Sequence, residues 1–153
     1  MPAVTESVRV SASLAEVWDF YFEPSGWPSW VDGFARVESS DGYPDRGGTL
    51  RWASTPAGRG TVEERVLEHD PRRRHRVAFT DPESEGELLT TFEIGAGPDD
   101  AATRVAQQFT YRLREAGPLT RLTDVFFIRP QIRRSLRRSL DRFTIEATER
   151  ASR

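Results

Sequence analysis

The 153-residue chain contains no cysteine and only two histidines, His69 and His75. The absence of thiols excludes disulfide bonds and thiolate metal sites, and two imidazoles are too few for the usual histidine-rich metal site. We therefore expect no metal. Lysine is absent as well, so all 22 basic residues are arginines, and 24 acidic residues offset them. Because the net charge is only −2, we expect no nucleic-acid partner.

The absence of other sequence features limits where the protein is expected to be located and which reactions it is expected to catalyse. No apolar run approaches the ~20 residues that cross a bilayer, and Met1–Glu6 lacks the basic and apolar regions of a secretory signal. We predict a cytoplasmic protein without stable membrane insertion. The sequence has no Walker loop, no dinucleotide fingerprint, no Gly-x-Ser-x-Gly elbow and no cysteine nucleophile. No cofactor is expected, and the remaining chemistry is what acid, base and shape can promote, such as aldol cyclisation or dehydration.

The N-terminal part predicts one strand and two short helices. Residues 5–10 alternate polar and apolar side chains, which is typical of a strand with one covered face. Ser13 followed by Glu16 fits a capping box, and the apolar spacing that follows predicts a helix to about Phe22. The aromatic stretch Trp27–Val31 predicts a second short helix.

Further along, short β-type runs alternate with turns rich in glycine, proline and aspartate. The short connections favour an antiparallel meander, because parallel pairing would need crossovers of a dozen or more residues. No linker or repeat divides the chain, so residues 1–153 are expected to form one domain. The six predicted strands are Ala35–Ser40, Thr49–Ser54, Gly60–His69, His75–Thr80, Leu88–Ile94 and Thr103–Leu113.

The last third, Gly117–Glu149, predicts a long amphipathic helix whose apolar stripe faces the sheet. Pro130 removes a backbone donor at a cost of ~3 kcal/mol or more in a helix interior, so we predict a kink near Phe126–Arg129. The arginines of this helix are expected on a solvated face. The arginine-rich hairpin after Asp70 should also be solvated, with His69 and His75 at the surface.

The motifs Ser13–Phe20, Trp27–Trp30 and Glu68–Arg73, in this order before the long helix, resemble the START-like (SRPBCC) superfamily. Within it, the chain resembles the bacterial polyketide cyclase/dehydrase and lipid-transport group. The resemblance implies an α+β helix-grip fold, in which a curved seven-stranded antiparallel sheet and a long C-terminal helix enclose a cavity. The superfamily includes aromatase/cyclases, lipid carriers and plant hormone binders, so the fold does not choose the function.

Strand alternation predicts which side chains enter that cavity. Aromatic walls suit planar or hydrophobic ligands, and polar residues among apolar neighbours should either pair with each other or meet the ligand. Helical geometry cannot place Phe126, Phe127 and Ile128 on one narrow face, so at least one of them is expected to meet the cavity entrance, a ligand or a partner. The candidate ligand-binding residues are Trp52, Glu64, Phe79, Thr90, Phe92, Gln107, Phe109, Tyr111 and Phe126.

Glu64 and Tyr111 are the candidate catalytic residues. A carboxyl group in an apolar site has a raised pKa and can act as an acid or base near neutral pH. The alternative for Glu64 is a rim carboxylate paired with an arginine, since the neighbouring Glu63 must face the other way and a bulge near Gly60 would exchange the two.

Three functions follow as hypotheses. The first is a binding module for a hydrophobic small molecule, either aromatic, polyketide-like or lipid-like. The second is a cofactor-independent cyclase or dehydratase that uses Glu64 or Tyr111. The third is a protein-interaction domain that uses the basic helix and Phe127. The sequence alone leaves all three open.

Overall fold

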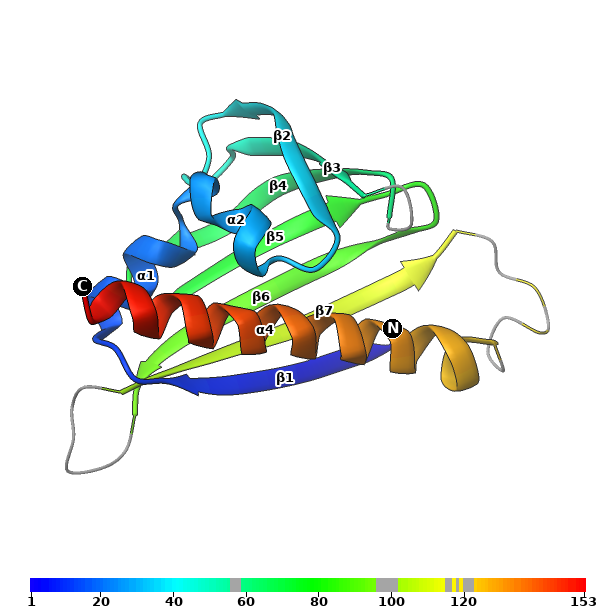
Figure 1. The fold of residues 1–153 in the computed structure, drawn as a ribbon. Helices are drawn as coiled ribbons and strands as arrows, with labels where there is room; N and C mark the ends of the chain where they lie inside the picture. Colours follow the sequence, from blue (N-terminus) through cyan, green and yellow to red (C-terminus); the bar gives the residue numbers. More distant parts are fainter. Residues whose placement is uncertain (56–58, 96–101, 115–116, 118, 120–122) are drawn as a thin grey trace.

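The computed structural model describes residues 1–55, 59–95, 102–114, 117, 119 and 123–153. Its centre is a seven-stranded antiparallel sheet in the order β1-β7-β6-β5-β4-β3-β2, curved around a long C-terminal helix (Figure 1). This confirms the predicted fold class. The strands are β1 Ala3–Val10, β2 Phe34–Asp41, β3 Thr49–Ser54, β4 Thr61–Asp70, β5 Arg74–Thr80, β6 Ser84–Ile94 and β7 Thr103–Leu113.

Strand β6 begins four residues before the predicted Leu88, at Ser84. Its first residues include charges and a glycine, which do not read as a strand. Gly86 lies opposite Tyr111 of β7, and a Cβ added there would stand 1.9 Å from the carbonyl oxygen of Thr110. A side chain would therefore not fit, and glycine permits the close pairing of β6 with β7.

Three short helical segments follow β1 and cover one end of the sheet. They are α1 Leu14–Tyr21, the 3-10 helix η1 Pro24–Gly26 and α2 Trp27–Trp30. The predicted capping box is present, because the Glu16 backbone N–H donates to Ser13 Oγ over 3.2 Å and the Ser13 N–H donates to the Glu16 carboxylate over 3.4 Å. Trp27 Nε1 donates to the carbonyl of Tyr21 over 2.8 Å, which fixes α2 against α1.

The C-terminal helix differs from its prediction at its start. Gly117 and Leu119 are not helical, and the helix consists of a π-helical turn, η2 Asp124–Ile128, followed by α4 Arg129–Ala151. The expected irregularity before Pro130 takes this form, with the Arg129 N–H donating to the carbonyl of Asp124 five residues back. Pro130 stands in the first turn of α4, where its missing N–H is tolerated.

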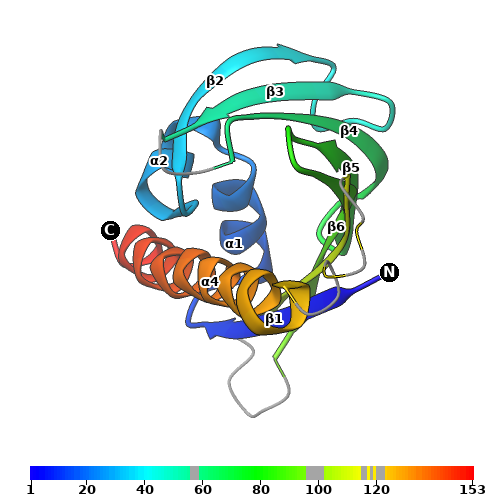
Figure 2. The ribbon, with the colours of Figure 1, turned by 90° about the vertical axis from the view of Figure 1, so that its right-hand side faces the viewer.

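The apolar stripe of α4 packs on the concave face of the sheet, as predicted. Leu140, Phe143 and Ala147 are buried, and Ile132 and Leu136 pack against the same core. Viewed along the helix, the sheet wraps around α4 from β1 to β2 (Figure 2). None of the described helices has the length and apolar character required to span a membrane.

Candidate functional site

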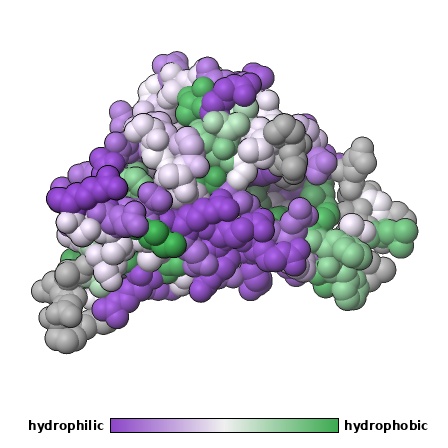
Figure 3. Space-filling view, viewed as in Figure 1, coloured by the Kyte–Doolittle hydropathy of each residue, from purple (hydrophilic) through white to green (hydrophobic). Residues whose placement is uncertain are grey.

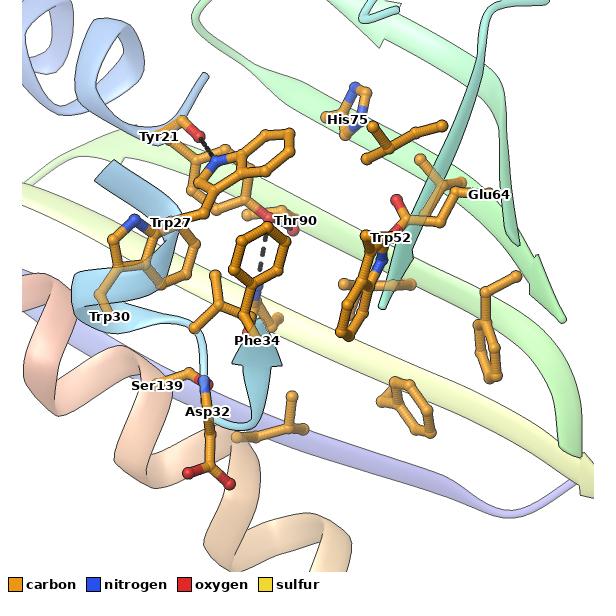
Figure 4. Close-up of a pocket in the computed structure, with 18 of the residues that line it drawn as sticks. Tyr21, Trp27, Trp30, Asp32, Phe34, Trp52, Glu64, His75, Thr90 and Ser139 are labelled. Atoms are coloured by element: carbon orange, nitrogen blue, oxygen red, sulfur yellow. Dashed lines mark hydrogen bonds between the residues drawn. The ribbon is translucent and has the colours of Figure 1, made fainter. Parts of the chain in front are cut away.

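A cavity of about 140 Å³ lies between the concave face of the sheet, α2 and α4 (Figure 4). Every strand except β1 contributes to its lining. Eight of the lining side chains are aromatic rings other than histidine: Tyr21, Trp27, Trp30, Phe34, Tyr43, Trp52, Phe79 and Phe109.

One half of the cavity is an aromatic wall with a cation against it. Phe79 and Phe109 stack with ring centroids 4.7 Å apart. The Arg59 guanidinium lies 4.8 Å from the centroid of Phe79, 5.4 Å from that of Phe109 and 5.9 Å from that of Trp52. These distances are within the range of cation–π attraction, so the wall offers a ligand both flat apolar surface and a positive charge.

Glu64 lies beside this aromatic wall, and its carboxylate accepts few hydrogen bonds from the protein. It follows the β4 alternation in which Val62 and Val66 are buried while Glu63 and Arg65 are exposed. Its carboxylate accepts a hydrogen bond from Trp52 Nε1 over 2.7 Å, and Figure 4 shows the two side chains next to each other. Burial raises the pKa of Glu64, and the Trp52 hydrogen bond and the Arg59 charge offset this only in part. Glu64 is half-buried and lines the cavity, so it faces the inner side of β4, and no described arginine forms an ion pair with it.

The opposite wall carries a satisfied polar network. The hydroxyl groups of Tyr21 and Thr90 are hydrogen bonded over 2.9 Å, and Gln107 Nε2 donates to the Tyr21 hydroxyl over 3.2 Å. Burial raises the pKa of Tyr21 to about 12, so the phenol remains protonated. Thr90 and Gln107 both line the cavity, yet each already has a protein partner.

Arg59 is held in place by a buried acid that the sequence did not single out. Its Nε and Nη2 donate to Asp81 Oδ2 over 2.9 and 2.8 Å. The other oxygen of Asp81 accepts from the backbone N–H groups of Glu83 and Ser84 over 2.9 and 2.7 Å. Burial opposes ionisation of Asp81, but Arg59 and these N–H donors hold its pKa below the ordinary value. Asp81 thus fixes the guanidinium beside the aromatic wall.

The prediction that His75 lies at the surface is wrong. His75 is 3% exposed and lines the cavity, and its Nδ1 lies 3.0 Å from Nδ1 of His69. Burial, followed by the neighbouring imidazole, lowers the pKa of His75 to about 3, so the ring is neutral. The signal was present in the sequence, because His75 shares the alternation of Val77 and Phe79 on β5.

At the cavity edge, the connection between α2 and β2 is bonded to α4. The Asp32 N–H donates to Ser139 Oγ over 2.8 Å, and its carboxylate accepts from Ser135 over 2.8 Å and from Arg138 over 3.1 Å. Burial acts against the charge of Asp32, but the Ser135 and Arg138 donors lower its pKa overall. These contacts span more than a hundred residues of sequence, so no local pattern could predict them.

Six of the nine predicted ligand-binding residues line the cavity: Trp52, Glu64, Phe79, Thr90, Gln107 and Phe109. Three others lie elsewhere. Phe92 is buried against Trp18, with ring centroids 4.9 Å apart, because α1 covers that end of β6. Phe126 is exposed, since the π turn carries it away from the sheet.

Tyr111 is the third residue outside the cavity. It is fully buried and its hydroxyl donates to Asp124 of η2, which is also paired with Arg129 over 2.7 Å. Burial and the hydrogen bond to Asp124 raise the pKa of Tyr111 to about 12. The hydroxyl is therefore engaged in fastening the C-terminal helix to β7 and does not face the cavity.

The fold is shared with solved structures of low sequence identity. The Zhui aromatase/cyclase from Streptomyces sp. R1128 is 21% identical, with a TM-score of 0.78 over 99% of this chain and 96% of that one. A protein from Thermus thermophilus is 20% identical, with a TM-score of 0.70 over 99% of this chain and 100% of that one. A Thalictrum norcoclaurine synthase is 13% identical, with a TM-score of 0.64 over 95% of this chain and 94% of that one.

A comparison with curated proteins gave no significant match. The family model described as polyketide cyclase/dehydrase and lipid transport, in contrast, matches residues 1–147. This match covers the strands, the short helices and nearly all of the C-terminal helix, and it agrees with the observed helix-grip architecture. The chain therefore belongs to the polyketide cyclase/dehydrase and lipid transport family.

Proposed function

We propose that the protein binds a hydrophobic aromatic small molecule in the cavity between the sheet and α4. The observation that carries the proposal is the pairing of Glu64 with Trp52 inside an otherwise aromatic wall. A cavity with apolar walls and few polar groups is the usual form of a small-molecule site. The flat rings would contact the ligand faces, and Glu64 would hydrogen bond to its polar substituent.

The size of the cavity limits the ligand. Its volume of about 140 Å³ is close to that of an engineered apolar cavity of roughly 150 Å³ that binds benzene. A single aromatic ring with small substituents fits this space. A longer molecule would have to extend past Asp32 and Ser135 at the cavity edge, or displace side chains.

A second candidate function, a cyclase or dehydratase, is favoured by the raised pKa of Glu64. As a carboxylate, Glu64 could remove a proton from the carbon beside a carbonyl group. As a carboxylic acid, it could return that proton to a hydroxyl group that leaves as water. The Arg59 charge beside the same wall would stabilise the enolate oxygen formed between these steps.

A binding titration tests the first proposal. Addition of 4-nitrobenzyl alcohol, a single aromatic ring with two small substituents, should quench the tryptophan fluorescence and give saturable binding. Leu88 lines the cavity, whereas its neighbour Leu89 pairs with the exposed Gln108 on the outer face. Leu88→Trp should fill the cavity and abolish binding, and Leu89→Trp should not. Equal binding in both variants, or no binding by the parent protein, would overturn the proposal.

A pair of neighbouring acids separates binding from catalysis. Glu64→Gln should keep the contact with Trp52 and weaken binding of 4-nitrobenzyl alcohol only modestly, whereas it should abolish turnover of a β-hydroxyketone test substrate if the protein is an enzyme. Glu63→Gln, on the exposed side of the same strand, is the matched control and should change neither. Turnover that persists in Glu64→Gln would exclude this carboxyl group as the acid–base residue.

A further inference from the structure

The start of the C-terminal helix exposes three consecutive apolar side chains, which we call the apolar tip. Val125, Phe126 and Phe127 of η2 are 48%, 66% and 70% exposed. Figure 3 shows the corresponding hydrophobic patch at the end of the molecule where the helix begins. Consecutive residues of a helix point in different directions, so this surface projects outward on several sides. Large exposed aromatic groups gathered in one place usually mark an interaction site.

Positive charge follows the apolar tip directly. Between Val125 and Leu140 the sequence contains five arginines and no acidic residue. Arg133 and Arg134, which we call the basic collar, follow Phe126 and Phe127 by seven residues and so lie in the first turns of α4, directly after the tip. Arg133 approaches Glu6 only to 4.0 Å, and Arg134 is exposed with no ion pair among the described residues. The collar therefore keeps most of its charge available.

No exposed acidic residue of η2 neutralises the positive charge of the basic collar. The one acidic residue of η2, Asp124, is buried and engaged by Arg129 and by the Tyr111 hydroxyl. This contact also fastens η2 to β7, so the tip is presented on a fixed support rather than on a free end. The middle of α4 beyond it is strongly hydrophilic on the face seen in Figure 3.

We propose that the apolar tip and the basic collar dock on the surface of a membrane that contains anionic phospholipids. The phenylalanine rings would enter the boundary between headgroups and acyl chains, and the arginines would contact lipid phosphates. The long arginine side chains can reach the headgroup level while their methylene groups stay near the tip. A second copy of the chain fits this surface poorly, because it would bring two basic collars together. The inference is independent of ligand binding in the cavity.

Vesicle co-sedimentation tests the proposal. The protein should sediment with vesicles of phosphatidylcholine and phosphatidylglycerol, less so at high salt, and hardly at all with phosphatidylcholine alone. The double variant Phe126→Ser with Phe127→Ser should bind at least about tenfold more weakly, because it removes the inserted apolar area. Arg133→Gln with Arg134→Gln should lose binding by about fivefold per arginine.

Matched controls on the same molecule sharpen the test. Ile145→Ser removes another exposed apolar residue of α4, 58% exposed, and Arg104→Gln with Arg112→Gln removes two exposed arginines from β7. Both should bind like the parent protein, and circular dichroism should confirm that all variants are folded. Failure to sediment with anionic vesicles, equal binding to neutral ones, or equal losses in the controls would overturn the proposal. So would a dimer in analytical ultracentrifugation that the phenylalanine substitutions abolish, since it would assign the tip to a second copy.

Discussion

Two interior carboxyl groups, Glu64 and Asp81, both lie within the electrostatic reach of Arg59, yet their pKa values shift in opposite directions. Asp81 accepts hydrogen bonds from Arg59 and from two backbone N–H groups. Among the described residues, Glu64 has a single donor, Trp52 Nε1. The comparison shows that direct contact with the Arg59 charge, together with two backbone donors, outweighs burial at Asp81, whereas one donor and a more distant cation do not outweigh burial at Glu64. Asp81 uses both carboxylate oxygens within the protein, whereas Glu64 has one donor and lines the cavity.

The largest expected effect on stability comes from replacing Asp81. Asp81→Asn removes the charge that fixes Arg59 and should lower the free energy of unfolding by about 2 kcal/mol, less than for a fully buried pair because the Arg59 side chain is 37% exposed. Urea denaturation at neutral pH measures this change. A loss as small as that of an exposed ion pair would remove the structural role given to Asp81.

The pH dependence of stability should separate the two acids next. The pKa of Asp81 is lowered, so the stability it contributes is present above its ordinary value of 3.8 and is lost as the pH falls through the folded-state value. The difference between the parent protein and Asp81→Asn should therefore shrink in acid. Glu64 has a raised pKa, so its ionisation costs stability as the pH rises above 4.5. Denaturation midpoints should be measured across this pH range for Asp81→Asn, Glu64→Gln and the parent protein. The difference between parent and variant, plotted against pH, should have opposite slopes for the two variants.

A smaller effect is expected from Glu64→Gln. The amide oxygen can still accept from Trp52, and no charge has to be buried, so the free energy of unfolding should stay the same or rise by less than about 1 kcal/mol. The pH dependence of 4-nitrobenzyl alcohol binding, measured by fluorescence, should become flat. A marked loss of stability would show that Glu64 has a structural role similar to that of Asp81.

The smallest effect is expected on the outer face of the sheet. Glu63 forms an exposed ion pair with Arg51 over 3.2 Å, and Glu63→Gln should change the free energy of unfolding by less than about 0.5 kcal/mol. This variant is the reference for the other two, since it removes one charge from the adjacent position of β4. A larger change would mean that charge on β4 matters irrespective of the side it faces.

Periodicity predicted those parts of the molecule that depend on local alternation. It placed Glu64 and Phe109 on the concave face correctly, because neighbouring valines and phenylalanines fix the register of β4 and β7. It could not show how far along a strand the cavity extends. Phe92 faces the same side as Thr90, but α1 covers it.

Local sequence patterns could not predict the contacts between segments that lie far apart in the chain. Asp32 and Ser135 meet only because α4 crosses the concave face beside α2. Arg59 reaches the aromatic wall from the connection between β3 and β4, and its anchor Asp81 lies beyond the next two strands. In contrast, the alternation of β5 could have placed His75 correctly. The prediction was wrong because the neighbouring arginines were expected to be solvated, and His75 was grouped with them.

The π turn of η2 affects how well the C-terminal helix should tolerate the deletion of one residue. Between hydrogen-bonded partners it holds one residue more than an α-helical turn does, as in the bond from Arg129 to Asp124. Because this extra residue is absorbed within a single turn, deleting it would restore ordinary helical spacing while the residues on either side keep their directions. Asp124 would then keep its contact with Tyr111, and the helix would stay fastened to β7. A deletion within α4, in contrast, would rotate the two parts of the helix against each other by about 100°. Shortening by one residue should therefore be tolerated better at this turn than within α4.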